Sequence, residues 1–158
     1  MRAVRYVDAF DREEFGVQFP EVGSAIAGFP EVDLKLDFDK EDFALRLGKE
    51  SADFIVANHV LEHLVNPLRF LERAHAVLRV GGTMFLGLPD KRRMFDRDRK
   101  RTPLADVVAR YNAGESVLSE ERIREYVEQV DRPEQPFVPG APGYEVQVER
   151  HRRRSLHV

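Results

Sequence analysis

The stretch ADFIVANHVLEHLVNPLRFLERAHAVLRVGGTMFLGLP, residues 52–89, decides the fold of this chain. Its two apolar runs, residues 54–57 and 84–88, predict two strands, and the segment between them predicts a helix. A strand, a helix and a second strand in this order form a parallel crossover, whose strands are expected to be buried on both faces.

The predicted strands end in polar residues. Asn58 and His59 follow the first strand, and Pro89 and Asp90 follow the second. Ligands of open α/β sheets bind beyond the carboxyl ends of parallel strands. These two strand ends are therefore expected to open onto one binding cleft.

The helix between the strands has clear start and stop signals. Asn66 is a suitable N-cap, and Pro67 suits the first helical position. Gly81 and Gly82 are expected to end the helix, because glycine adopts the left-handed conformation at low cost. Its apolar stripe consists of Leu68, Leu71, Ala74, His75 and Leu78.

Three motifs in this stretch resemble those of class I S-adenosylmethionine-dependent methyltransferases. ANHVLEHL, residues 57–64, resembles the motif at the end of that family's fourth strand. LERAHAVLRVGGTMFLGLP, residues 71–89, resembles the helix, the double-glycine turn and the fifth strand that follow. PDKRRMFD, residues 89–96, has the form that one subgroup shows after this strand. The resemblance implies an α/β fold with a Rossmann-like, doubly wound, mostly parallel sheet, and S-adenosyl-L-methionine as cofactor.

Two aspartates take cofactor-binding roles by this resemblance. Asp8 follows a predicted strand at 4–8, and there it would accept hydrogen bonds from both ribose hydroxyls. An ordinary aspartate in a turn is the alternative. Asp37 follows an alternating segment at 32–37 and matches the acid that binds the adenine amino group.

Asp39 is the second choice for the adenine contact. It equally fits the N-cap of a helix predicted at 40–48. By the same resemblance, Asn58 and His59 line the methionine end of the cofactor or the substrate, and His59 is the candidate catalytic base.

HVLEH, residues 59–63, also has the form H-x-x-E-H of a class of zinc peptidases, in which both histidines bind zinc and the glutamate is the base. That motif lies inside a long helix, whereas this one follows directly on a predicted strand. The sequence therefore does not favour a metal site. Glu62 and His63 are expected mainly to fix the turn.

The basic segment KRRMFDRDRKR, residues 91–101, follows the second strand. Asp90, Lys91 and Arg92 are expected at the rim of the pocket, where cations can hold an anionic substrate group. Two helices are predicted beyond it, one that begins at Thr102-Pro103 and ends at Gly114 and one capped by Ser119.

The chain is expected to divide into three parts. Residues 1–102 form a partial methyltransferase core, and residues 103–130 form a helical insertion or cap. Residues 131–158 hold a Pro/Gly-rich loop, an edge strand predicted at 144–148 and a basic C-terminal segment.

Composition narrows the class of protein. The 158 residues suit one domain, and 42% of them are hydrophobic, which is enough for a core. The net charge of -3 predicts no general attraction to nucleic acid or to acidic membranes. There is no cysteine for a disulfide, and no apolar run approaches the roughly 18 residues of a membrane span. We expect a cytoplasmic protein, and the resemblance implies a small-molecule substrate.

The glycine-rich turn that follows the family's first strand has no counterpart in this sequence. In the family that strand lies in the centre of the sheet, so the resemblance is to the middle of a methyltransferase. Three explanations compete: a truncated fragment, which we favour, a degenerate homologue, or a domain completed by a partner chain. The unpaired sheet edges that result are expected to favour a homodimer or aggregation.

The sequence thus predicts methyl transfer to O, N or C of a small acceptor. Such catalysis depends mainly on holding donor and acceptor in line. A non-catalytic or partner-dependent module of the same fold is the alternative, and a zinc hydrolase through HVLEH is a weaker third.

Overall fold

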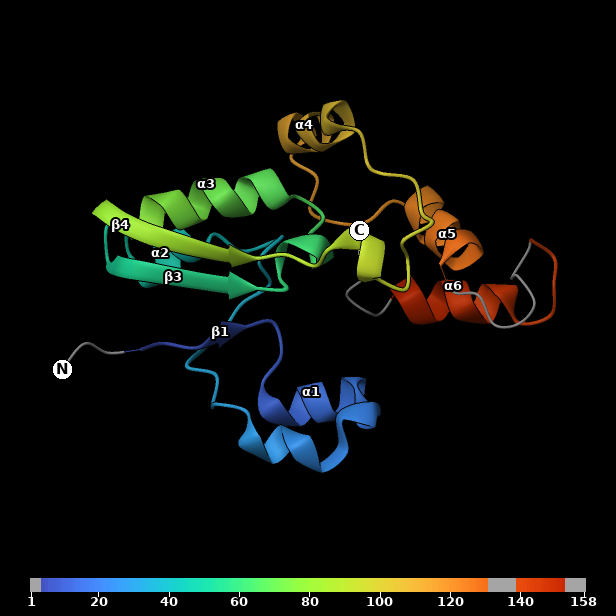
Figure 1. The fold of residues 1–158 in the computed structure, drawn as a ribbon, viewed down its shortest axis with the longest axis horizontal. Coiled ribbons are helices and arrows are strands. Elements are labelled where there is room, and N and C mark those ends of the chain that lie inside the picture. The colour runs from blue at the N-terminus through green and yellow to red at the C-terminus, as the bar shows by residue number, and fades with distance from the viewer. Residues whose placement is uncertain (1–3, 131–138, 153–158) are drawn as a thin grey trace.

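The computed structural model describes residues 4–130 and 139–152, and it contains two separate pairs of parallel strands. β1 (Val7–Asp8) pairs with β2 (Leu34–Lys35), and β3 (Ala52–Asn58) pairs with β4 (Leu78–Gly87). Within the described residues no strand joins the two pairs. Figure 1 shows α3 lying along β3 and β4, with β1 on the far side of β3.

The central crossover has the predicted order. The three-residue helix η2 (Leu61–His63) follows β3, and α3 (Pro67–Val77) leads back to β4. The side chain of Asn66 accepts a hydrogen bond from the backbone N–H of Arg69 at 3.1 Å, and Pro67 occupies the first turn. The start of the helix is therefore as predicted.

The end of α3 differs from the prediction. The helix stops at Val77, four residues before Gly81, and β4 begins at once with Leu78. The backbone N–H groups of Glu50 and Ser51 bond to the last carbonyl groups of the helix, at 3.0 and 2.8 Å. The chain that enters β3 thus satisfies the end of α3, and no glycine is needed there.

The two glycines instead serve an irregular part of β4. Gly81 has a φ of +80°, and the register with β3 shifts between Ala52 and Phe54. A Cβ on Gly82 would lie 2.9 Å from the carbonyl oxygen of Arg79. Glycine is therefore required by close backbone packing inside the strand.

Only one face of the β3–β4 pair is covered, contrary to the prediction that the strand at 54–57 is buried on both faces. Ala57 is buried, but Phe54 and Val56 are 53% and 67% exposed. The rings of Phe54 and Phe85 pack on each other at 4.8 Å on the open face, which no described element covers. The covered face contributes to the main core, which comprises Leu36, Phe43, Ala44, Ala57, Leu64, Phe70, Ala74 and Val77.

Two helices, α1 (Arg12–Gln18) and the 3₁₀ helix η1 (Pro20–Gly28), connect β1 to β2. Asp11 caps α1 in a reciprocal arrangement with Glu14. Both helices lie on the side of β1 away from β3 (Figure 1).

The helix α2 (Phe43–Leu47) begins later than predicted. Its N-cap is Asp42, whose side chain accepts a hydrogen bond from the N–H of Ala44 at 3.0 Å. Asp39 therefore does not cap this helix. It accepts hydrogen bonds from Val65 and Asn66 and ties the loop before α2 to the start of α3.

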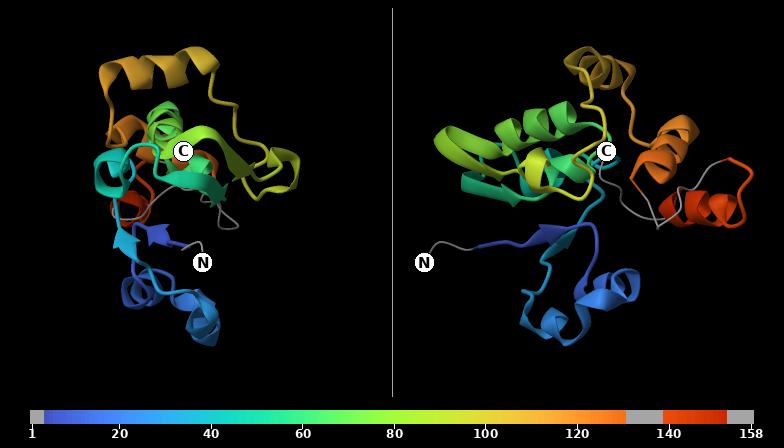
Figure 2. Two further views of the ribbon diagram at one scale, coloured as in Figure 1. Left: turned by 90° about the vertical axis from the view of Figure 1, so that its left-hand side faces the viewer. Right: turned by 45° about the vertical axis from the view of Figure 1, so that its right-hand side comes forward.

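After η3 (Lys91–Arg93), three helices complete the described chain: α4 (Leu104–Ala113), α5 (Glu120–Gln129) and α6 (Tyr144–Arg152). Gly114 ends α4 with a φ of +69°, and Ser119 caps α5, both as predicted. Figures 1 and 2 show α5 and α6 side by side, beyond the carboxyl ends of β3 and β4.

The edge strand predicted at 144–148 is wrong, because α6 occupies this segment. Tyr144 and Val148 lie one helical turn apart and are buried against α5, whereas Val146 is 69% exposed. The alternation of apolar residues fitted a strand as well as a helix, and packing decided between them. Most of the predicted Pro/Gly-rich loop, at 131–138, and the segment 153–158 lie outside the described residues.

The helices are short throughout the described part of the chain. α3 is the longest α-helix there, with 11 residues. None of the described helices has the length and apolar character needed to cross a membrane.

Candidate active site

The strand ends singled out from the sequence lie together. β3 and β4 are parallel, and Asn58 stands opposite Gly87 in their register. Pro89 and Asp90 follow β4 directly, so both strands end at the same edge. This edge is where ligands of open α/β sheets bind.

Asn58 and Gly87 approach each other closely at this edge. A Cβ on Gly87 would lie 2.0 Å from Oδ1 and 3.0 Å from Cγ of Asn58. Only glycine leaves room for the amide in its present position. The side chain of Asn58 is held over the end of β4, with its polar atoms at the exposed edge.

His59 has an unusual backbone conformation. Its φ is +53°, in the left-handed region that non-glycine residues rarely adopt. Its N–H donates to the carbonyl oxygen of Gly87 at 2.9 Å, which ties this turn to β4. Such conformations cluster at functional sites, where the surrounding structure holds them in place.

The imidazole of His59 pairs with Glu62. Nδ1 of His59 lies 3.1 Å from Oε1 of Glu62. The side chain of Glu62 is 13% exposed, whereas that of His59 is 54% exposed. The arrangement therefore places a largely buried carboxylate behind an accessible imidazole.

HVLEH does not form the interior of a long helix. His59 precedes the three-residue helix that contains Glu62 and His63, so the two histidines do not share a helix face. Within the described residues no group of three or more His, Cys, Asp or Glu side chains is arranged to hold a metal ion.

Asp8 lies in the other sheet. It ends β1, and its Oδ1 accepts a hydrogen bond from the N–H of Phe10 at 3.1 Å. Its backbone carbonyl oxygen accepts from Leu36, which continues the β1–β2 pairing. The structure therefore places Asp8 at a carboxyl end, on a strand that does not pair with β3.

The carboxylate of Asp37 makes most of its hydrogen bonds within the turn that follows it. Its Oδ1 accepts hydrogen bonds from the N–H groups of Asp39 and Lys40, and its Oδ2 pairs with Nζ of Lys40 at 2.8 Å. The carboxylate is 43% exposed, so it remains accessible from one side. An adenine amino group would share this carboxylate with Lys40.

The expected rim residues satisfy one another. The guanidinium of Arg92 makes a forked contact with Asp90, with Nη2 2.7 Å from Oδ2. Asp90 also caps η3 through the N–H of Arg92. The side-chain hydrogen bond from Arg92 holds the pKa of Asp90 below its usual range. Lys91 donates from Nζ to the carbonyl oxygen of Asp96, at 3.1 Å.

Asn66 and Arg110 form a buried polar junction that sequence reasoning missed. Asn66 is 1% exposed and donates from Nδ2 to the carbonyl oxygens of Arg110 and Glu115. Arg110 is 3% exposed and donates from Nη1 to the carbonyl oxygen of Val65 at 3.0 Å. The junction fixes α4 across the start of α3. The sequence offered no signal for it beyond the N-cap, because its partners lie 44 to 49 residues apart.

Asp39 contributes to the same region. Its two oxygens accept from the N–H groups of Val65 and Asn66, at 3.0 and 2.9 Å. Burial raises the pKa of this carboxyl, although the two hydrogen bonds act in the opposite direction. Asp39 therefore holds the loop that follows η2. Both of its carboxylate oxygens are used there, which disfavours a role in cofactor binding.

Two hollows lie away from these strand ends. One of about 460 Å³ lies where β3 and β4 begin, and its lining includes His75, Arg79 and Gly82. The other, of about 420 Å³, lies against α1, and its lining includes Phe10, Glu13 and Val17. Neither hollow is lined by Asn58 or His59, so the candidate site is defined by the side chains at the strand ends.

These side chains fit part of a nucleoside-containing cofactor. A carboxylate at the end of β1 and an amide at the end of β3 are suitable partners for hydroxyl and amino groups. Gly87 leaves space beside the backbone at this edge, but the side chain of Asn58 already occupies that space. Within the described residues no glycine-rich turn lies between the two sheets.

Comparison with known proteins gives one match. The sequence model of a family described as "Methyltransferase domain" matches residues 6–131. No curated protein and no solved structure matches the chain. The matched segment contains both pairs of strands and the crossover between β3 and β4, and it implies a Rossmann-like α/β fold. By this match over most of its length, the chain belongs to the methyltransferase domain family.

Proposed function

We propose that this chain is an S-adenosyl-L-methionine-dependent methyltransferase that acts on a small-molecule acceptor at the carboxyl ends of β3 and β4. The family supports methyl transfer as the general activity, and domains of this kind generally use this cofactor. The observation that carries the proposal is the position of Asn58 opposite Gly87, with the N–H of His59 bonded to Gly87, at one edge of a parallel pair.

The polar side chains at the carboxyl ends of both strand pairs have proposed roles. Asp8 accepts hydrogen bonds from the ribose hydroxyls, and Asp37 accepts one from the adenine amino group. Asn58 and His59 lie along the methionine end. The cofactor, when bound, supplies a methyl group made electrophilic by the sulfonium. The protein's own task is to hold the acceptor in line with that methyl group.

Asp90, Lys91 and Arg92 form the proposed rim of the acceptor site. The forked contact between Asp90 and Arg92 leaves this pair with little net charge. Lys91 uses its ammonium group on a backbone carbonyl, which leaves its positive charge unneutralised. Of the two cations at this rim, Lys91 is thus the better suited to attract an anionic acceptor.

Calorimetric titration with S-adenosylhomocysteine tests the cofactor assignment. We expect a dissociation constant in the micromolar range, and Asp8→Asn should weaken binding roughly tenfold through a lost charge-assisted hydrogen bond. Asp53→Asn is the matched control, because Asp53 pairs with Arg79 at the opposite end of β3. Absence of binding by the folded wild-type chain would contradict the proposal.

A second candidate is a methyltransferase-like module that a partner completes. It is favoured by the two separate strand pairs and by the open apolar face with Phe54, Val56 and Phe85. Unpaired edges and exposed apolar patches of this kind are typical of association sites. We extend this to a homodimer formed through these edges.

Sedimentation equilibrium distinguishes this second candidate. A homodimer formed through these edges and the open apolar face beside them should weaken strongly in Phe54→Ser, while Val80→Ser, at an exposed position near the start of β4, should leave it unchanged. A wild-type chain that stays monomeric at high micromolar concentration would exclude the homodimer.

A further inference from the structure

The contact between His59 and Glu62 is isolated from other polar partners. Both carboxylate oxygens of Glu62 are buried, and no residue in the described part of the chain makes a well-aligned hydrogen bond to either of them. Nδ1 of His59 makes a polar contact with this carboxylate, at 3.1 Å from Oε1. A buried carboxylate without donors is costly, so a proton on Nδ1 of His59, directed at Oε1, would offset part of that cost.

The backbone fixes which face of the imidazole meets the carboxylate. The left-handed φ of +53° at His59 turns the chain sharply after β3, and the N–H of His59 is bonded to Gly87. The turn brings His59 and Glu62 together across three residues, with Glu62 on the covered side. The imidazole is 54% exposed and follows the end of β3, with Nδ1 as the nitrogen that meets Glu62.

We propose that Glu62 is a positioning residue that holds the proton of the neutral His59 imidazole on Nδ1, so that Nε2 accepts a proton from the methyl acceptor. A carboxylate that accepts from one ring nitrogen determines the tautomer and leaves the other nitrogen as the base. This inference rests on the proposed function for the identity of the reaction, whereas the tautomer is inferred from the 3.1 Å approach of Nδ1 to a buried carboxylate and needs no cofactor.

The proton transfer balances without a further reactant. The acceptor atom forms its bond to the methyl carbon with its own electron pair, and the pair of the broken C–S bond stays on sulfur. The proton of the acceptor passes to Nε2 of His59. The resulting imidazolium lies beside the carboxylate of Glu62, which stabilises its positive charge.

The pair also narrows the class of acceptor. A neutral imidazole assists only where the attacking atom carries a proton that it must lose. Alcohols, phenols and amines meet this condition, whereas carboxylates and thioethers do not. We therefore infer an acceptor with a hydroxyl or amino group.

Long-range ¹H–¹⁵N correlation spectra of the full chain, labelled with ¹⁵N-histidine, test the tautomer directly. At a pH where the imidazole is neutral, His59 should show a pyrrole-type shift at Nδ1 and a pyridine-type shift at Nε2. The wild-type spectrum alone overturns the proposal if Nε2 carries the proton. No cofactor or acceptor is needed for this measurement.

A matched pair of variants tests the role of Glu62. Glu62→Gln keeps the shape and removes the charge, and it should lower the ratio of the Nδ1–H to the Nε2–H tautomer roughly fivefold. Glu13→Gln, at an exposed position of α1, should leave the ratio unchanged. An unchanged ratio in Glu62→Gln would overturn the positioning role.

Failure of the proposed function gives a different pattern. If His59 carries its proton on Nδ1 but the chain does not bind S-adenosylhomocysteine, the role of Glu62 is supported and the methyltransferase assignment is contradicted. A chain that binds S-adenosylhomocysteine and carries its proton on Nε2 retains the assignment and loses the proposed base.

Discussion

In the β3–α3–β4 crossover the side chains that join helix to sheet are almost all apolar, whereas α5 and α6 are joined by a row of ion pairs over a small apolar core. Phe70, Ala74 and Val77 of α3 are 4%, 0% and 1% exposed. Ile123, Tyr126, Val127, Tyr144 and Val148 form the separate core between α5 and α6.

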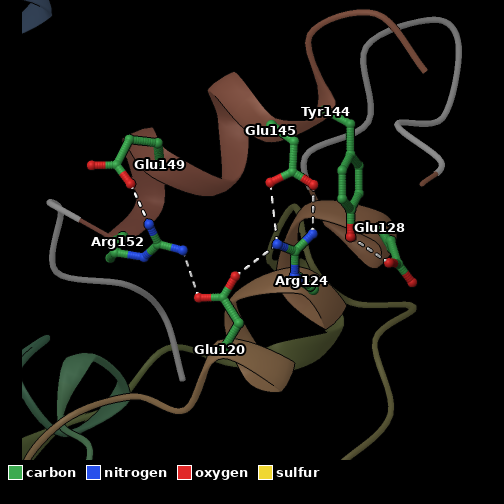
Figure 3. Close-up of polar contacts among 7 residues, drawn as sticks. All are labelled: Glu120, Arg124, Glu128, Tyr144, Glu145, Glu149 and Arg152. Carbon is green, nitrogen blue, oxygen red and sulfur yellow. Dashed lines mark hydrogen bonds and ion pairs between the residues drawn. The ribbon is translucent and has the colours of Figure 1, made fainter. Parts of the chain in front are cut away.

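Figure 3 shows how the charges of the α5–α6 pair are arranged. Arg124 lies between Glu120 and Glu145, 2.8 Å from each. Arg152 bridges Glu120 and Glu149, and the hydroxyl of Tyr144 donates to Glu128 at 2.7 Å. Nearly every charge in the view therefore has an opposite charge beside it.

The strand ends show the reverse pattern. Asn58 and His59 are exposed, and the buried carboxylate oxygens of Glu62 have no hydrogen-bond partner in the described residues beyond the 3.1 Å approach of His59. The charges of α5 and α6 pair with one another, whereas the carboxylate of Glu62 is left without a hydrogen bond in the described residues. Groups left incompletely paired are the better guide to a site.

The largest expected effect is on stability, in the apolar core between α3 and the β3–β4 pair. Phe70→Ala should lower the free energy of unfolding by about 3–5 kcal/mol, because it leaves a cavity among Phe38, Phe43 and the sheet. Urea unfolding monitored by methyl resonances of Val77 and Val148 would measure it. If the signal of Val148 moved as far as that of Val77, α5 and α6 would not be a separate core.

Gly87→Ala should affect the site more than the fold. The new Cβ would overlap Oδ1 of Asn58, and this side chain must rotate away, at a cost of about 1–2 kcal/mol in stability. Binding of S-adenosylhomocysteine should fall by more than tenfold in titration calorimetry. Gly28→Ala is the control, because nothing lies within 4 Å of a Cβ there. Equal effects of the two variants on binding would contradict the role of Asn58.

Two tyrosine–glutamate contacts provide a matched test within the helices. Tyr144→Phe removes the bond to Glu128 from a ring that is 2% exposed, and it should cost about 1 kcal/mol in thermal unfolding. Tyr111→Phe removes the contact with Glu72, which raises the pKa of Tyr111, from a residue that is only partly buried. Its effect on stability should be the smaller of the two, and the opposite order would show that burial does not govern these contacts.

Acidification should change the stability of the two regions in opposite directions. It should weaken the α5–α6 pair and favour the fold around Asp39, and both effects should be smaller than those of the substitutions above. Hydrogen bonds from Arg152 and Arg124 lower the pKa values of Glu120 and Glu145, so their stabilisation is present above the usual glutamate pKa and is lost as the pH falls through the lowered values. Burial raises the pKa of Asp39, so its ionisation disfavours the folded state as the pH rises through that raised value.

Methyl resonances followed from about pH 7 to about pH 3 would check this difference. Val148 of α6 should broaden or shift before Ala74 of α3, and added salt should move it in the same direction by screening the ion pairs. Earlier loss of the Ala74 signal would contradict the comparison.

Local signals predicted much of the central fold. The Asn66-Pro67 start of α3, the parallel pairing of β3 with β4, the Ser119 cap and the Gly114 stop are all confirmed. Each depends on residues that interact within a few positions along the chain or on the periodicity of one segment. The family resemblance is confirmed by the match to residues 6–131.

Predictions that depended on distant partners were wrong. Gly81 does not end α3, because Glu50 and Ser51 already satisfy its last carbonyl groups. Asp39 does not cap α2, because it bonds to the start of α3, 26 residues away. The proposed roles of Asp8, Asp37, Asn58 and His59 stay predictions.

The sequence by itself determined the crossover, the N-cap of its helix and the family, because periodicity and N-caps are properties of neighbouring residues. Tertiary structure alone decided that Phe54 stays exposed, that residues 144–148 form a helix and that Glu62 lies behind His59. Those outcomes depend on which surfaces meet, and the same residue pattern is compatible with more than one arrangement until the surfaces are packed together.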